Sequence, residues 1–139
     1  MNIYFAGAIR GGRNDKELYF ELITYLKQFG TVLSEHIFLD TQLEQEKKGE
    51  VTSQDIYERD MAWVRQADVI IAEVTIPSLG VGYELASAEH LGKPTLCLFR
   101  TGEGRRLSAM IGGAEHFTVV EYEEVEGAKK AIEEFCKNL

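Results

Sequence analysis

Short apolar segments alternate with amphipathic helical patterns along the whole chain, and this alternation strongly constrains the fold. The segments with the length and composition of buried strands are 2–6, 31–34, 69–73, 95–99 and 117–120. Helical patterns at 15–29, 52–67, 82–91 and 125–137 separate or follow them, and 107–111 forms one short turn. Because strand–helix–strand connections are right-handed, the pattern predicts an α/β fold: a five-stranded, mostly parallel sheet with helices on both faces, Rossmann-like or flavodoxin-like.

Composition excludes several classes of partner. The 139 residues are 45% hydrophobic, which is ordinary for a single domain covering 1–139. A net charge of −8, spread along the chain, disfavours a nucleic-acid polymer or an anionic membrane as the partner. Cys97 and Cys136 fit no metal or disulfide spacing, so we expect reduced cysteines, a buried Cys97 and no metal site. We also expect no cofactor. With no apolar span and no secretory leader in the pattern, we expect a cytoplasmic protein.

The loop that follows the third strand is the first candidate for a ligand site. Gly80 and Gly82 would let the backbone approach a ligand, and Ser78 adds a hydroxyl beside the free amides of a helix start. We expect Glu84 in the first turn of that helix, so the loop would hold a small anion next to a carboxylate. A glutamate in a first turn also suits the helix dipole without any catalytic role, so this segment alone does not decide.

The loop after the first strand, Gly7-Ala-Ile-Arg-Gly-Gly-Arg13, is the second candidate. Its glycines free backbone amides, and Arg10 and Arg13 are cationic. Strand order usually reverses between the first and third strands, which would bring the two loops together. The spacing fits neither a Walker A loop nor a dinucleotide fingerprint, so a single phosphate is the expected ligand. The alternative is a surface turn with solvated arginines.

Asp60 is the second candidate carboxylate. It falls at helical spacing with Ile56, Trp63 and Ala67, which predicts a position on the core-facing stripe of the 52–67 helix. A buried carboxylate without a partner is costly, so Asp60 needs either a partner or a function. The structural alternative is a carboxylate bonded to a neighbouring tyrosine or backbone amide.

These segments together closely resemble the 2′-deoxynucleoside 5′-phosphate N-hydrolases, the Rcl proteins, which have the nucleoside 2-deoxyribosyltransferase fold. The resemblance spans nearly the whole chain. It rests on Tyr4-Phe-Ala-Gly-Ala-Ile-Arg-Gly-Gly-Arg13, Glu35-His36, Asp60-x-x-Trp63, Gln66-Ala-Asp-Val69, Ala72-Glu-Val-Thr-x-Pro-Ser-Leu-Gly-Val-Gly-Tyr-Glu-Leu85, Leu96-Cys-Leu-Phe-Arg100 and Leu107-Ser-Ala-Met-Ile111. It implies one catalytic domain that cleaves the N-glycosidic bond of a deoxynucleoside 5′-monophosphate, releasing a free base and 2-deoxyribose 5-phosphate.

The resemblance also implies roles for individual residues. Glu84 would be the nucleophile, and Asp60 and Tyr4 would assist it. The substrate-binding residues that it implies are Gly7, Ala8, Ile9, Arg10, Gly11, Ser78, Gly80 and Gly82, with Ser108 and Met110 from the partner subunit of a homodimer. His36 would line the base pocket.

The chain departs from the family pattern at Ala8, where a serine is typical, so one hydroxyl is absent from the expected phosphate loop. The base preference is open, because 40–51 matches no pattern. Three other functions are compatible with parts of the sequence. A nucleoside deoxyribosyltransferase would have little use for Arg10 and Ser78, a ribonucleoside monophosphate N-glycosidase would accept a 2′-hydroxyl, and a non-catalytic nucleotide-binding module would not need both carboxylates.

Overall fold

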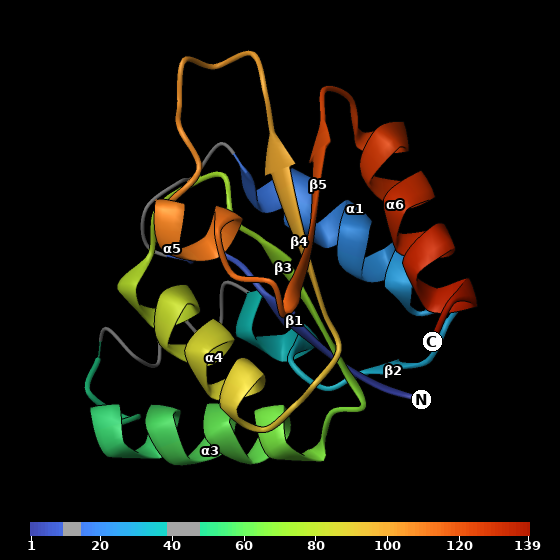
Figure 1. Cartoon of the computed structure of the whole chain (residues 1–139). Coiled ribbons are helices and arrows are strands. Elements are labelled where there is room, and N and C mark those ends of the chain that lie inside the picture. Colours follow the sequence, from blue (N-terminus) through green and yellow to red (C-terminus); the bar gives the residue numbers. More distant parts are fainter. Residues whose placement is uncertain (10–14, 39–47) are drawn as a thin grey trace.

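The computed structural model describes residues 1–9, 15–38 and 48–139 and has a single five-stranded sheet (Figure 1). The strands are β1 (Asn2–Ala6), β2 (Thr31–Val32), β3 (Val69–Glu73), β4 (Thr95–Arg100) and β5 (Phe117–Tyr122). Their order is β2-β1-β3-β4-β5, and every strand pairing among the described residues is parallel. The predicted α/β class is therefore confirmed, with the strand order of the flavodoxin-like type.

Helices cover both faces of the sheet. The elements are α1 (Lys16–Leu26), the short 3-10 helix η2 (Glu35–Phe38), α3 (Ser53–Gln66), α4 (Leu79–His90), α5 (Ala109–Gly112) and α6 (Val125–Lys137). Figure 1 shows α1 and α6 on one face, with α3 and α4 on the other. None of the helices in the described ranges is long and apolar enough to cross a membrane.

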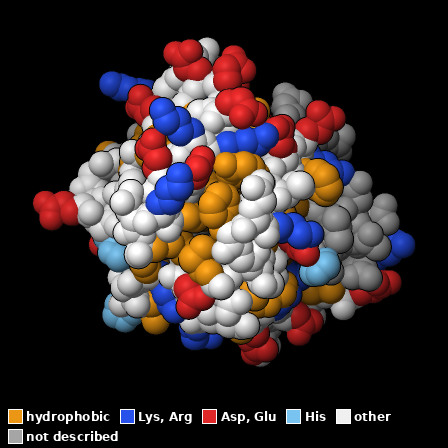
Figure 2. Space-filling view, turned by 90° about the vertical axis from the view of Figure 1, so that its right-hand side faces the viewer, with side chains coloured by type: hydrophobic (Ala, Val, Ile, Leu, Met, Phe, Trp, Pro, Cys, Tyr) orange, Lys and Arg blue, Asp and Glu red, His pale blue; other side chains and the backbone are white. Residues whose placement is uncertain are grey.

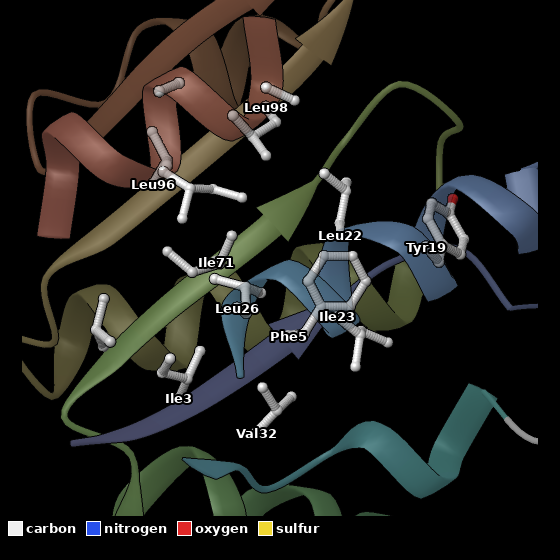
Figure 3. Close-up of a cluster of buried hydrophobic side chains, with 14 of the residues drawn as sticks. Ile3, Phe5, Tyr19, Leu22, Ile23, Leu26, Val32, Ile71, Leu96 and Leu98 are labelled. Atoms are coloured by element: carbon white, nitrogen blue, oxygen red, sulfur yellow. The ribbon is translucent and has the colours of Figure 1, made fainter. Parts of the chain in front are cut away.

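The alternation of side chains along β1 assigns its residues to two separate cores. Ile3 and Phe5 pack toward α1 and α6 in the cluster drawn in Figure 3, whereas Tyr4 and Ala6 point to the α3 and α4 face. Full burial of a side chain such as Leu22 contributes about 1.5–3 kcal/mol. The two cores therefore fix β1 firmly, and they direct the Tyr4 phenol to the α3 and α4 side.

The outer surface agrees with the dispersed charge of the sequence. On the face at the right of Figure 1, acidic and basic side chains are interspersed rather than gathered by sign (Figure 2). Lys129 on α6 pairs with Glu21 of α1 at 2.8 Å, and Lys137 pairs with Glu133 one turn away at 2.7 Å. Such exposed pairs each contribute at most about 1 kcal/mol.

Helix α3 begins as predicted. The Thr52 side chain accepts a hydrogen bond from the Asp55 backbone N–H at 3.1 Å, and the Asp55 carboxylate accepts one from the Thr52 N–H at 3.0 Å. This reciprocal capping box satisfies two amides that a helix start would otherwise leave free. Cys97 is fully buried in β4, also as expected.

Helix α4 begins earlier than predicted. Ser78 is its N-cap, because the Ser78 Oγ accepts a hydrogen bond from the Val81 N–H at 3.3 Å. The helix therefore starts at Leu79 and includes both Gly80 and Gly82. Glu84 lies in the second turn, so the expectation that it would sit in the first turn was wrong. The 35–51 segment begins with η2, and positions 39–47 lie outside the described residues.

Candidate active site

The strand order reverses between β1 and β3, and a cavity of about 600 Å³ lies at the carboxyl ends of these two strands. Its walls come from the loop after β1, from α3, and from the start of α4. The lining residues are Gly7, Ala8, Ile9, Ile56, Arg59, Asp60, Pro77, Ser78, Leu79, Gly80, Val81 and Glu84. Two loops and two carboxylates that are far apart in the sequence therefore meet in one hollow.

Tyr4 and Glu84 form the centre of this hollow. Tyr4 is almost completely buried in the middle of β1, and its hydroxyl donates a hydrogen bond to Glu84 Oε2. Burial raises the pKa of Glu84 to about 8, since desolvation disfavours the charged carboxylate. A donor to Oε2 favours the charged form instead, so the Tyr4 phenol opposes the effect of burial.

Asp60 lines the same cavity from α3, and it is paired. Its Oδ1 accepts a hydrogen bond from Arg59 Nε at 2.9 Å, and its side chain is partly exposed. The buried stripe of α3 runs through Met61 and Val64 instead, so the prediction that Asp60 faces the core is corrected. Asp60 is one position away from this stripe, which places it at the border of the cavity.

Sequence reasoning missed Arg59 as a residue of this cavity. Its guanidinium lies over the Trp63 ring, 5.2 Å from the ring centroid, while its Nε reaches Asp60. The signal was present in the sequence, because positions 59 and 63 are four residues apart on one helix and therefore share a face. The stacked ring and the carboxylate hold the guanidinium at the cavity wall.

The other predicted substrate-binding residues do not all line this cavity. Gly82 and Ser108 line a neighbouring hollow of about 460 Å³ between α4 and α5, together with Met110. Ser78 lines both hollows. His36 is exposed and lines a third hollow of about 170 Å³ beside α1. Arg10 and Gly11 lie outside the described residues.

A further hollow of about 490 Å³ adjoins the cavity that contains Glu84 and extends along α3 and α4. It shares Asp60, Gly80 and Glu84 with the first hollow and adds Tyr57 and Tyr83, whose rings meet edge to face at 6.0 Å. Both tyrosines are about half exposed. This extension gives the carboxylate site an apolar and aromatic side, which suits the flat face of a base.

The family model for nucleoside 2-deoxyribosyltransferase matches residues 3–133. The chain belongs to this family. A mouse relative named 5-hydroxymethyl-dUMP N-hydrolase is 54% identical over 131 residues, which covers 90% of this chain and 74% of the relative. A relative of the same name from Tetraodon nigroviridis is 49% identical over 146 residues and covers 99% of both chains.

The solved structure of a Clostridium botulinum CMP N-glycosidase has the same fold as this nucleoside 2-deoxyribosyltransferase family member. The TM-score is 0.70 over 97% of this chain and 99% of that chain. Their sequences are only 16% identical, so this likeness supports the architecture alone.

Chemically, the site of this family member combines a carboxylate, a phenol that donates to it, and the N-terminus of α4. An ionised carboxylate can attack a sugar carbon and form a covalent ester with the sugar. The free amides and the positive end of a 12-residue helix suit an anionic group of the ligand.

Proposed function

We propose that this chain hydrolyses the N-glycosidic bond of 2′-deoxynucleoside 5′-monophosphates and releases a free base and 2-deoxyribose 5-phosphate. The observation that carries this proposal is the hydrogen bond from Tyr4 to Glu84 in the wall of a cavity that also contains the N-terminus of α4. Relatives that are 54% and 49% identical bear the name 5-hydroxymethyl-dUMP N-hydrolase. Their names favour a 5-substituted deoxyuridine monophosphate as the substrate.

In the proposed mechanism, a Glu84 oxygen attacks C1′ while the bond from C1′ to the base nitrogen breaks. The electron pair of that bond leaves with the base, which takes up a proton. Positive charge develops on the sugar in an oxocarbenium-like transition state. Water then attacks C1′ of the glycosyl ester, loses a proton, and releases Glu84 as a carboxylate. Tyr4 holds the attacking carboxylate, and Asp60 orients Glu84 or protonates the departing base.

We assign the 5′-phosphate to the two glycine-containing loops. Ser78 and Gly80 at the start of α4 line the same cavity as Gly7, Ala8 and Ile9. By resemblance, Arg10 and Gly11 complete this site. Charge-assisted bonds to a phosphate are strong, so the matching nucleoside should have a kcat/KM lower by about 100-fold or more.

We further propose a cytoplasmic homodimer whose subunits share their active sites. Leu79 and Met110 are 96% and 82% exposed and line the hollow between α4 and α5, and such apolar exposure on a small domain favours an interface. Ser108 and Met110 would then reach the site of the partner subunit. Free Cys97 and Cys136 fit a reducing compartment.

The deciding experiment is product analysis by liquid chromatography. The enzyme is incubated with 5-hydroxymethyl-dUMP, dUMP, dGMP, CMP and the nucleoside 5-hydroxymethyl-deoxyuridine, each with and without an added free base. Base release from a deoxynucleoside monophosphate, unaffected by the added base, is expected. Formation of a new nucleoside would favour a transferase. Preferred cleavage of CMP would favour a ribonucleotide glycosidase, and no base release from any compound would favour a binding module.

A further inference from the structure

A buried polar cluster lies at the carboxyl edge of the sheet but outside the cavity. Its central group is Glu73, the last residue of β3, which is completely inaccessible to solvent. Its Oε1 accepts a hydrogen bond from the Thr75 N–H at 2.7 Å, and its Oε2 accepts bonds from the Thr75 hydroxyl at 3.0 Å and from the Tyr122 hydroxyl. Burying a carboxylate is costly, and the three donors offset this cost and hold Glu73 in place where β3 ends.

Arg100, the last residue of β4, connects this cluster to α1. Its backbone N–H donates to the Thr75 hydroxyl at 2.8 Å. Its Nη2 donates to both carboxylate oxygens of Asp15, at 2.9 and 3.1 Å. Asp15 is 3% exposed and is the N-cap residue of α1, which follows β1. In Figure 1 the start of α1 lies behind the carboxyl ends of β3 and β4.

Arg100 therefore contacts both the loop that leads into α4 and the residue at which α1 begins. Thr75 is three residues before Ser78, where the loop after β3 enters α4. Asp15 closes the connection that begins at Gly7 after β1. None of Asp15, Thr75 and Arg100 lines the cavity itself. Their bonds tie the loop before α4 to the start of α1 behind the cavity.

We propose that Arg100 is a positioning residue that sets the separation of the two anion-binding loops, through Thr75 on one side and Asp15 on the other. This inference rests on the proposed function, in which both loops hold the 5′-phosphate. The Asp15 contact acts on the loop after β1 and therefore on phosphate binding. The Thr75 contact acts on the loop that continues into α4, and therefore also on the position of Glu84.

The first test compares Asp15→Asn with Glu103→Gln. Both variants remove a carboxylate from the same guanidinium, since Arg100 Nε also donates to Glu103 at 2.9 Å, but Glu103 contacts neither loop. Asp15→Asn should raise KM for 5-hydroxymethyl-dUMP about tenfold and change kcat less than about twofold, because the charge-assisted contacts of Arg100 with Asp15 are weakened. The kcat/KM for the nucleoside should not change. Glu103→Gln should match the wild type.

The second test compares Thr75→Val with Thr95→Val. Both threonines are buried, but Thr95 lies at the other end of the sheet, where its hydroxyl donates to the Lys93 carbonyl at 2.8 Å. Thr75→Val should lower kcat about tenfold, because the loop leading to Glu84 loses both hydroxyl bonds. Thr95→Val should lose comparable stability in a thermal melt and keep the wild-type kcat. Thr75→Ser keeps the hydroxyl and should have the wild-type kcat. If Thr75→Val does not fold, the kcat of Thr75→Ser tests the role of the hydroxyl instead.

The outcomes separate the two proposals. A wild-type enzyme that releases no base would overturn the proposed function and, with it, this role of Arg100. An active wild type with Asp15→Asn and Thr75→Val both equal to their controls would overturn the positioning role alone. So would an equal rise in KM for the monophosphate and the nucleoside, or a Thr75→Ser variant as slow as Thr75→Val.

Discussion

At the scale of single residues, the site places two requirements on Glu84 that conflict. The cavity wall buries the carboxylate, which raises its pKa to about 8. The proposed attack on C1′ needs the ionised form, so the Tyr4 hydroxyl must make that form available near neutral pH. In the proposed mechanism, burial makes the ionised carboxylate reactive, and the Tyr4 hydrogen bond increases the ionised fraction.

The first prediction concerns Tyr4. In the wild type, kcat/KM should rise with pH through an ionisation near 8, which is the pKa of Glu84. Tyr4→Phe removes a hydrogen bond to the charged form, so this rise should move to higher pH by about 1 pH unit. Initial rates between pH 5.5 and 9.5 measure both profiles. A Tyr4→Phe variant that is uniformly slower at every pH would contradict the role of Tyr4 in ionising Glu84.

The second prediction concerns stability. A folded-state pKa near 8 is above the ordinary value of 4.5, so the folded protein binds a proton more tightly than the unfolded chain between these values. The stability contributed by protonated Glu84 is therefore lost as the pH rises toward 8. Glu84→Gln cannot ionise, so it should melt about 3–6 °C above the wild type at pH 8.5 and at the same temperature at pH 4.

Thermal melts across this pH range measure the difference, and Glu89→Gln serves as the control. Glu89 lies on the same helix but is exposed, so its replacement should give no gain that grows with pH. Glu84→Gln and Glu84→Ala should both lower kcat at least about 1,000-fold, because they lack the nucleophile. A Glu84 variant that is less stable than the wild type at pH 8.5 would show that the carboxylate is not held in a costly environment.

At the scale of elements, the sequence was informative wherever one local rule decided the outcome. Helical and strand periodicity identified the order of elements, and the helical pattern at 52–67 located the start of α3. The start of α4 was missed because the Pro, Ser and Gly residues of 77–82 were interpreted as a loop, whereas one serine hydroxyl is sufficient to cap the helix at Ser78. Glycine lowers helix propensity, but the packing of α4 outweighs this cost and the helix still forms through Gly80 and Gly82.

Contacts between elements were less predictable. Periodicity alone gave Asp60 a core-facing position, because a shift of one residue on a helix changes the direction of a side chain by about 100°. The Asp15–Arg100 bond joins residues that are 85 positions apart, and no local pattern in either segment predicts it. Such pairings depend on the strand order, so only the folded sheet shows them.

The third prediction concerns the two glycines Gly7 and Gly82. A Cβ on Gly7 would lie 3.1 Å from Cζ of Tyr19, so Gly7→Ala must displace a buried ring and should cost about 1–3 kcal/mol. A Cβ on Gly82 would meet no atom within 4 Å, and this position is inside α4. Gly82→Ala should therefore stabilise the protein by about 0.5–1 kcal/mol.

Urea unfolding measures both changes, and the opposite signs are the test. Gly7→Ala should also raise KM for the monophosphate, since the added methyl group belongs to the loop that lines the cavity. A Gly82→Ala variant as destabilising as Gly7→Ala would contradict this prediction.

At the scale of the whole molecule, the proposed site residues of one chain are divided between two hollows. The carboxylates and the loop after β1 share one cavity, whereas Ser108 and Met110 belong to the neighbouring hollow between α4 and α5. Leu79 borders both hollows and is almost fully exposed. An arrangement in which a second copy covers α4 and α5 would bury this side chain and bring a partner serine toward the phosphate.

The fourth prediction tests this shared site by complementation. Glu84→Ala and Ser108→Asp should each be inactive alone, the first for lack of the nucleophile and the second because its carboxylate repels the phosphate. In a mixed dimer, one site carries both defects, and the other combines Glu84 from one chain with Ser108 from the other. Random exchange of equal amounts forms mixed dimers in half of the cases, each with one intact site. Activity should therefore return to about a quarter of the wild-type value.

The control mixes Glu84→Ala with the double variant Glu84→Ala/Ser108→Asp, a combination in which no site has a nucleophile and no activity should return. Subunit exchange is verified separately by mass spectrometry of a tagged and an untagged chain, and sedimentation gives the oligomeric state. A fully active monomer would contradict the shared site. So would verified exchange without recovery of activity, because each site would then depend on the residues of its own chain alone.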